Sequence, residues 1–183
     1  MESMGDVLNR CGSDKNLPGC HTYAFVYERL FPDRAAVSAV FEIGVAGGGS
    51  IRAWHEIFYN AIVVGLDAGP APEGLAGPRI EIHRGDQRNR AAVMECVRGR
   101  EFDLVIDDAS HILADQLLCL FWLWPHLMSG GYYVIEELDI QNWVGPAVGP
   151  IGNKDSIGLL KNAQLVETPG PGGPEYLLVI RKE

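Results

Sequence analysis

Residues 41–50 read Phe-Glu-Ile-Gly-Val-Ala-Gly-Gly-Gly-Ser. They complete an apolar run that predicts a buried strand over 39–43, and Ser50 can cap a helix predicted over 51–59. A glycine-rich turn between a strand and a helix lets a ligand lie directly against the backbone, where the first N–H groups of the helix have no partner. This stretch therefore predicts a ligand site at the carboxyl end of a strand.

A second predicted strand, 62–67, ends on the carboxylate of Asp67. An acidic residue about 20 residues after such a turn can accept hydrogen bonds from both hydroxyls of a ribose. The turn and Asp67 together indicate a cofactor that contains adenosine.

Two adenosine cofactors fit this pattern. Gly44, Ala46 and Gly49 approximate the dinucleotide turn G-x-G-x-x-G, which would indicate NAD. Gly44, Ala46 and Gly48, preceded by Glu42, equally suit the G-x-G-x-G turn of enzymes that use S-adenosylmethionine (SAM). A cationic sulfonium favours nearby carboxylates, which the sequence supplies at Glu42, Asp67, Asp86, Asp107 and Asp108. We therefore favour SAM over NAD.

Strand-like and helix-like segments alternate along the rest of the chain. Strands are predicted over 39–43, 62–67, 79–83, 102–107, 132–135, 164–167 and 176–181, and helices over 51–59, 88–97, 112–127 and about 156–162. This order predicts an α/β fold, a Rossmann-like doubly wound sheet that is mostly parallel. The Pro- and Gly-rich turn 169–174 predicts an antiparallel hairpin at the C-terminal end. We expect one domain over residues 1–183.

Composition excludes several classes of partner. The formal net charge is −9, with 15 basic and 24 acidic residues, which argues against nucleic acid. The longest apolar run, 117–123, is too short to cross a membrane, and the polar start of the chain does not resemble a secretory signal. The four cysteines include no C-x-x-C pair. We therefore expect a cytoplasmic protein with free thiols and a small-molecule substrate.

Five segments resemble the successive motifs of class I SAM-dependent methyltransferases: 42–50, 65–67, 85–87, 102–111 and 130–137. More narrowly, Asp107-Asp108-Ala109-Ser110-His111 and Val134-Ile135-Glu136-Glu137 resemble the metal-dependent sugar O-methyltransferases of macrolide antibiotic pathways, the mycinamicin type. The segment Ser13-Asp14-Lys15, with His21 and Tyr23, adds to this resemblance.

The resemblance implies a set of cofactor residues. Asp67 would hold the ribose, Asp86 and Gln87 would lie near the adenine, and Asp107 would point toward the transferred methyl group. Ser13 and Lys15 would anchor the amino-acid end. The full set of candidate cofactor residues is Glu42, Gly44, Ala46, Gly48, Ser50, Asp67, Asp86, Gln87, Asp107, Ser13 and Lys15.

Methyl transfer from a sulfonium is a direct displacement, so the enzyme must align and deprotonate an alcohol. Asp108 and His111 follow one predicted strand, and Glu136 and Glu137 follow the next. Asp108, Glu136 and Glu137 form an oxygen-only set of the kind that Mg²⁺ prefers. The resemblance implies that these three bind the metal, with Asp108 and His111 catalytic and His111 the general base. The acceptor would be a hydroxyl on the sugar or polyketide part of a natural product.

Several alternatives stay open at this stage. Glu137 stands where the family has Asp, and one extra methylene can disturb a demanding Mg²⁺ octahedron, while Asp139 is a substitute ligand. Trp143, in the loop after the fifth parallel strand, is a candidate to cover the acceptor. An NAD-linked oxidoreductase, a non-catalytic SAM-binding protein and a homo-oligomer are also compatible with the sequence.

Overall fold

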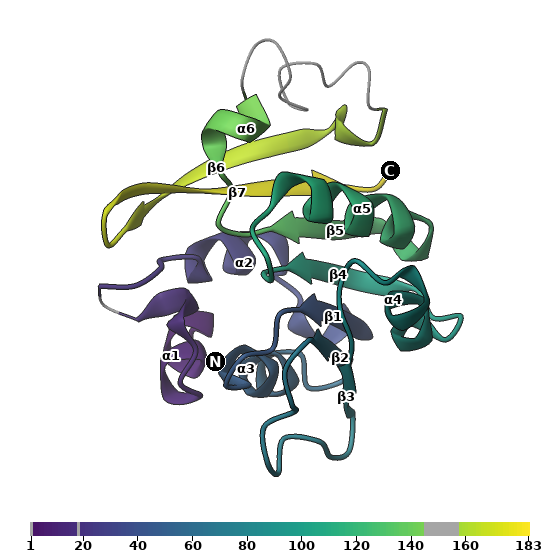
Figure 1. The fold of residues 1–183 in the computed structure, drawn as a ribbon. Coiled ribbons are helices and arrows are strands. Elements are labelled where there is room, and N and C mark those ends of the chain that lie inside the picture. Colours follow the sequence, from purple (N-terminus) through teal and green to yellow (C-terminus); the bar gives the residue numbers. More distant parts are fainter. Residues whose placement is uncertain (1, 18, 145–157) are drawn as a thin grey trace.

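The computed structural model describes residues 2–17, 19–144 and 158–183. Within them the strands form one seven-stranded sheet of order β3-β2-β1-β4-β5-β7-β6 (Figure 1). Five neighbouring strands are parallel, and β7 pairs antiparallel with both β5 and β6. The strands are β1 (Ala39–Ile43), β2 (Ile62–Asp67), β3 (Ile80–Arg84), β4 (Phe102–Asp107), β5 (Leu127–Ile135), β6 (Ala163–Gly170) and β7 (Gly173–Arg181).

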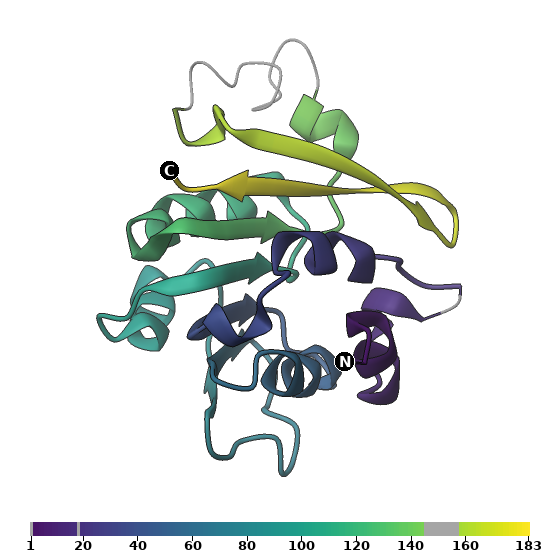
Figure 2. The same ribbon diagram turned by 180° about the vertical axis from the view of Figure 1, so that it is seen from behind.

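Helices cover both faces of this sheet (Figures 1 and 2). They are α1 (Met4–Arg10), α2 (Ala24–Leu30), α3 (Gly49–Ile57), α4 (Arg90–Val97), α5 (Leu113–Leu123) and α6 (Ile140–Val144), with 3-10 turns at Asp14–Asn16, Arg34–Ala36, Trp124–His126 and Gly158–Leu160. Side chains of α1, α2 and α3 pack with Val40 and Ile106 in one core. Side chains of α4, α5 and α6 pack with Phe41 and Val105 in the other. Successive strand residues thus serve opposite faces, as the strand period of two requires.

The predicted α/β architecture is confirmed, including the mostly parallel sheet and the antiparallel hairpin. The hairpin is longer than the sequence indicated, since β6 and β7 pair from Ala163 with Ile180 to Gly170 with Gly173. No helix of the described residues is long and apolar enough to cross a membrane.

The segments before residue 39 contain two helices that sequence reasoning missed. Each of α1 and α2 has only 7 residues, shorter than the window in which a helical period can be recognised. Ser3 caps α1 by accepting a hydrogen bond from the backbone N–H of Asp6. Both helices are held mainly by burial, because Met4, Leu8 and Tyr27 are fully covered.

Three predicted elements differ in extent. The helix expected over 112–127 ends at Leu123, because Pro125 closes a 3-10 turn and Leu127 already starts β5. Gly130 therefore lies inside β5, where the register with β4 shifts, instead of leading into it. The helix expected near 156–162 is described only from residue 158, where a 3-10 turn is found, and residues 145–157 lie outside the described part.

The prediction that Trp143 covers the acceptor is wrong. Trp143 lies on α6 and is fully buried, and its Nε1–H donates to Oε1 of Gln116 at 2.8 Å. An indole ring carries a large apolar surface, and burying it against the α5 side of the sheet outweighs leaving it at the surface.

The site depends on the close approach of β1 and β4, where the strand order reverses. Asp108 donates its backbone N–H to the carbonyl of Ile43 at 2.9 Å. A Cβ atom on Gly44 would lie 1.9 Å from the carbonyl oxygen of Asp108, and the φ of Gly44 is 94°. Both the close contact and the left-handed backbone require glycine at position 44. Ligands of doubly wound sheets bind at this kind of crevice, where the strand order reverses.

We predict that Gly44→Ala destabilises the protein by more than about 2 kcal/mol, because a left-handed backbone and an overpacked contact each add a cost. Gly47→Ala is the matched control, since a Cβ at Gly47 meets nothing within 4 Å. Urea unfolding followed by circular dichroism measures both variants. Equal stability of the two would contradict the proposed contact.

Candidate active site at the carboxyl ends of the strands

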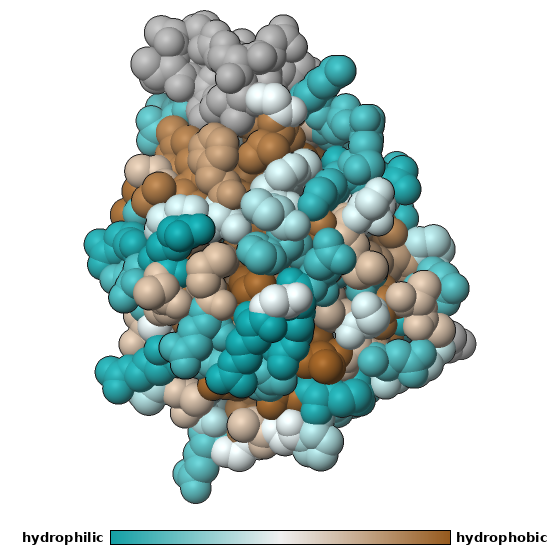
Figure 3. Space-filling model, turned by 90° about the vertical axis from the view of Figure 1, so that its right-hand side faces the viewer, coloured by the Kyte–Doolittle hydropathy of each residue, from teal (hydrophilic) through white to brown (hydrophobic). Residues whose placement is uncertain are grey.

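A cavity of about 550 Å³ lies at the carboxyl ends of β1, β2 and β4. Its lining includes these predicted site residues: Gly44, Ala46, Asp67, Asp86, Gln87, Asp108, His111 and Glu137. A hollow of similar size, about 560 Å³, lies beside Ser129, Lys161 and Arg181. Figure 3 shows the face of the molecule where the parallel strands begin. Hydrophilic (teal) and hydrophobic (brown) side chains are mixed over that face. None of the predicted site residues lines this second hollow, so the first cavity is the candidate active site.

The carboxylate of Asp67 organises the glycine-rich turn. Its Oδ2 accepts from the backbone N–H groups of Val45 at 2.8 Å and Ala46 at 2.9 Å, and its Oδ1 accepts from Gly69 at 2.7 Å. Burial would raise the pKa of Asp67, but these three donors outweigh burial and lower it. Asp67 is therefore an anion at the cavity wall, as the ribose prediction requires.

Glu42 and Ser50 lie behind the turn and do not line the cavity. Ser50 Oγ donates to Glu42 Oε2 at 2.8 Å, which ties the end of β1 to the start of α3. Burial raises the pKa of Glu42 to about 7, although Lys15 opposes the shift. Gly48, with a φ of 78°, forms the N-cap of α3. These three residues shape the turn from its protein side.

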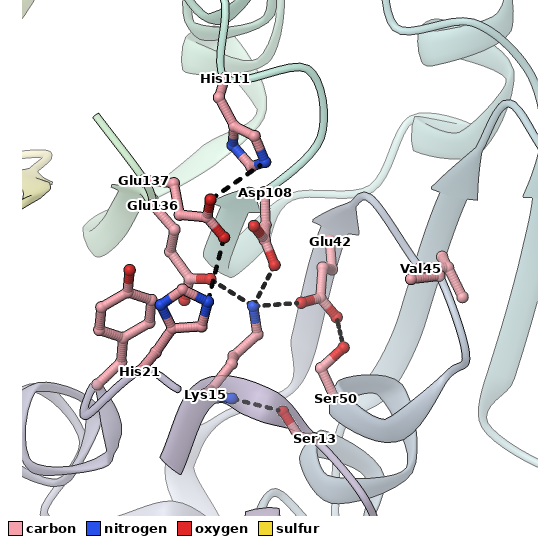
Figure 4. A network of polar contacts seen from close by, with 12 residues as sticks. Ser13, Lys15, His21, Glu42, Val45, Ser50, Asp108, His111, Glu136 and Glu137 are labelled. Carbon is pink, nitrogen blue, oxygen red and sulfur yellow. Dashed lines mark hydrogen bonds and ion pairs between the residues drawn. The ribbon is translucent and has the colours of Figure 1, made fainter. Parts of the chain in front are cut away.

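Lys15 carries a buried ammonium that faces three carboxylates (Figure 4). Its Nζ lies 2.5 Å from Asp108 Oδ2 and 3.3 Å from Glu42 Oε1, and it also donates to Glu136 Oε2. Burial lowers the pKa of Lys15, but the three carboxylates outweigh burial and raise it well above its ordinary value. Lys15 is therefore the counter-ion of this acidic cluster.

Ser13 supports this placement as the N-cap of the 3-10 turn that carries Lys15. Its Oγ accepts from the backbone N–H of Lys15 at 3.3 Å. A Cβ on Gly49 would lie 2.5 Å from the carbonyl oxygen of Gly12, so the turn rests directly on the start of α3. The role of Ser13 and Lys15 in holding the amino-acid end of a cofactor stays a prediction.

The carboxylates of Glu136 and Glu137 point in different directions although they are neighbours in the chain (Figure 4). Glu136 is fully buried and uses both oxygens, accepting from Tyr27 Oη–H and from Lys15. Glu137 is 37% exposed in its side chain and faces the cavity. The sequence leaves Tyr27 open as a helix-packing residue or a ligand contact, and the structure places its hydroxyl on the carboxylate of Glu136.

Asp108, His111 and Glu137 each offer one ligand atom within 4.8 Å of the others. His111 Nε2 lies 3.6 Å from Glu137 Oε2. Among the described residues, His111 Nδ1 is buried without a hydrogen-bond partner. Two of the three predicted metal ligands, Asp108 and Glu137, thus come together with the predicted base, while Glu136 lies outside this group and Lys15 contacts both Asp108 and Glu136.

The backbone at this cluster is strained. The φ of His111 is 56° and that of Glu137 is 48°, both in the left-handed region, and Ala46 across the cavity has a φ of 44°. Residues other than glycine rarely adopt this conformation, and such strain gathers at functional sites. The observation supports a functional role for these loops.

The remaining predicted cofactor residues have distinct surroundings. Gln87 Oε1 accepts from the backbone N–H of Ser110 at 3.0 Å, which links the loop after β3 to the Asp107–His111 loop. Asp86 is paired with Arg88 at 2.6 Å at the cavity edge. Asp107 is fully buried, and burial followed by the charge of Asp108 raises its pKa to about 7.

Two curated proteins with similar sequences indicate the relationship of this chain to known enzymes. The sequence is 37% identical over 164 residues to the 8-demethyl-8-alpha-L-rhamnosyl tetracenomycin-C 2'-O-methyltransferase of Streptomyces olivaceus, covering 83% of this chain and 42% of the relative. It is 36% identical over 159 residues to the mycinamicin VI 2''-O-methyltransferase of Micromonospora griseorubida, covering 78% of this chain and 38% of the relative. The chain is homologous to sugar O-methyltransferases.

The solved structures agree with this relationship. The structure of MycE, a methyltransferase of the mycinamycin biosynthetic pathway in complex with Mg and S-adenosylhomocysteine (SAH), is similar with a TM-score of 0.76 and 28% identity, over 99% of this chain and 55% of that chain. The chain therefore has the class I methyltransferase fold. It spans less than half the length of the curated relatives, and no family model matches it.

We predict that Lys15→Met destabilises the metal-free protein by about 3 to 5 kcal/mol, because it leaves buried carboxylates without their cation. Adding Glu136→Gln to Lys15→Met should recover part of this loss, since one of those carboxylates then becomes a neutral amide. Urea unfolding of the single and double variants in the presence of a chelator measures the coupling. A loss below about 1 kcal/mol would show that the cluster behaves like an exposed ion pair.

Stability should also fall as the pH rises from 5.5 to 8 in the metal-free protein. The pKa values of Glu42 and Asp107 rise from 4.5 and 3.8 to about 7 on folding, so the folded state holds protons that the unfolded state has lost. Each group accounts for a loss on the order of 2 kcal/mol over this interval. Asp107→Asn should flatten the pH dependence of the free energy of unfolding, and an unchanged slope would rule the assignment out.

Proposed function

We propose that this chain is a SAM-dependent O-methyltransferase that methylates a sugar hydroxyl of a small-molecule natural product, with help from Mg²⁺. The observation that carries the proposal is the opening of one cavity onto both the Asp67 turn and the Asp108, His111 and Glu137 cluster. A cofactor and an acceptor hydroxyl can then meet at a single point. The curated relatives, named for 2'- and 2''-O-methylation, favour this reading over an NAD-linked oxidoreductase.

The cavity fits an adenosine cofactor. Its volume of about 550 Å³ lies within the usual range of small-ligand sites. Asp67 can accept from ribose hydroxyls while it keeps its backbone donors, because a carboxylate has about four acceptor positions. Gly44 and Ala46 of the turn line the cavity, where their small size leaves the backbone accessible.

The acidic cluster fits a hard divalent cation. Asp108 and Glu137 supply carboxylate oxygens, the ligands that Mg²⁺ prefers, and Glu136 lies behind them on Lys15. We propose that Asp108 and Glu137 hold the metal and that Glu136 joins them or supports Asp108 through Lys15. A bound Mg²⁺ would make the acceptor hydroxyl more acidic.

We assign the role of proton acceptor to His111. Its Nε2 faces Glu137 at the mouth of the cavity, and an imidazole accepts a proton near neutral pH. The acceptor oxygen forms a bond to the methyl carbon while the bond from that carbon to sulfur breaks. The hydroxyl proton moves to Nε2 of His111, and the products are a methyl ether and SAH. Lys15 stays charged throughout and balances the surrounding carboxylates.

We predict that His111→Ala and Asp108→Asn each lower the methylation rate on an L-rhamnoside by about 100-fold or more, because the first removes the proposed general base and the second a charged ligand of the proposed metal. SAH affinity, measured by titration calorimetry, should stay within about threefold of the parent protein. His126→Ala, a change in the 3-10 turn after α5 and outside the cavity lining, is the control.

One result would contradict the whole proposal, and another would contradict only its metal part. Absence of SAH binding by the unaltered protein would exclude the methyltransferase function. Full activity after exhaustive chelation would exclude the metal and leave His111 as the only source of deprotonation.

A further inference from the structure

The imidazole of His21 lies between two carboxylates from distant parts of the chain. Figure 4 shows its contact with one of them, Glu137. His21 Nδ1 is 2.7 Å from Glu175 Oε2 on β7, and His21 Nε2 is 3.3 Å from Glu137 Oε1. An imidazole can donate from both nitrogens when each carries a proton. The ring therefore links the C-terminal hairpin to the acidic cluster of the active site.

The position of the His21 ring is fixed from several sides. It stacks on Tyr23 with ring centroids 4.8 Å apart, and the hydroxyl of Tyr23 donates to the same Glu175 oxygen at 3.1 Å. Next to it, Thr22 Oγ1 donates to the carbonyl of Pro169 at 2.9 Å. The side chain of His21 is only 16% exposed. His21 is thus held by both the N-terminal segment and the β6–β7 hairpin.

Glu137, in contrast, depends on imidazoles for its orientation. Its Oε1 faces His21 and its Oε2 faces His111, and within the described residues no other ion pair or hydrogen bond of its side chain is found. Glutamate has one more rotatable bond than aspartate, so holding it in one position costs more conformational entropy. A fixed ring on its outer side lowers that cost.

We infer that His21 is a positioning residue that holds Glu137 toward the metal, and that Glu175 orients His21. The inference rests on the proposed Mg²⁺-assisted function and assigns a role in it to the hairpin. Histidine and carboxylate pairs behind metal ligands fix ligand orientation, and their loss lowers metal affinity by about 10- to 100-fold. His21 contacts neither the acceptor nor the cofactor in this role.

A pair of substitutions at His21 separates the two ring nitrogens. His21→Gln places an amide nitrogen near the position of Nε2 and can still donate to Glu137, whereas His21→Asn reaches only Glu175. We expect His21→Asn and Glu175→Gln to weaken Mg²⁺ binding by about 10-fold or more. His21→Gln keeps a donor toward Glu137 but loses the contact with Glu175, so its loss of Mg²⁺ affinity should be smaller than that of His21→Asn. Cys20→Ser, in the same loop, is the matched control.

Titration calorimetry of Mg²⁺ into protein saturated with SAH measures these affinities without turnover. The Mg²⁺ concentration for half-maximal rate should rise in parallel, with kcat at saturating Mg²⁺ unchanged. SAH affinity and the melting temperature report whether a variant is folded. If His21→Asn is unfolded, Glu175→Gln carries the test, since it keeps the imidazole and removes only the negative charge that orients it.

The outcomes are distinguishable from failure of the proposed function. An unaltered protein that binds no SAH refutes the methyltransferase itself. An unaltered protein that binds SAH and Mg²⁺, with equal Mg²⁺ affinity in His21→Asn and Glu175→Gln, refutes only the role of His21. SAH binding without Mg²⁺ binding refutes both this inference and the metal part of the proposed function.

Discussion

One buried ammonium makes the rest of the active site possible. Three carboxylates, from Glu42, Asp108 and Glu136, meet at Lys15, and the desolvation of each would cost several kcal/mol without a compensating charge. The cation comes from the N-terminal segment, whereas the anions come from the ends of β1, β4 and β5. Docking of the first 16 residues is therefore a condition for gathering the acids, and the packing of Gly12 against Gly49 makes that docking close.

In each pair of adjacent acidic residues, one member is buried in the fold and the other faces the active-site cavity. Asp107 and Glu136 are buried, whereas Asp108 and Glu137 line the cavity. Successive residues at the end of a strand point to opposite sides, so each acidic pair sends one member inward and one outward. Of the buried members, Glu136 contacts Lys15 and Tyr27. Asp108 and Glu137 line the cavity and can contact a ligand there.

The architecture and the cavity could be predicted from sequence because both follow from local patterns. Alternating strands and helices define the sheet, and the glycine turn with Asp67 and the acids after β4 and β5 marks its carboxyl edge. The contacts of Lys15 with Asp108 and Glu136, and that of Glu175 with His21, could not be predicted, since each joins residues more than 90 positions apart. Trp143 was misplaced for a related reason. A short apolar helix that packs on α5 has no period of its own.

Two indole rings lie one side chain away from Glu136. Trp54 packs on Tyr27 with ring centroids 4.8 Å apart, and Tyr27 donates to the carboxylate of Glu136. Trp143 donates to Gln116, whose amide reaches the carbonyl of Glu136 at 3.4 Å. Indole emission responds to nearby charge and polarity. Of the four tryptophans, Trp54 and Trp143 are consequently positioned to report on the acidic cluster through their fluorescence, with no label required.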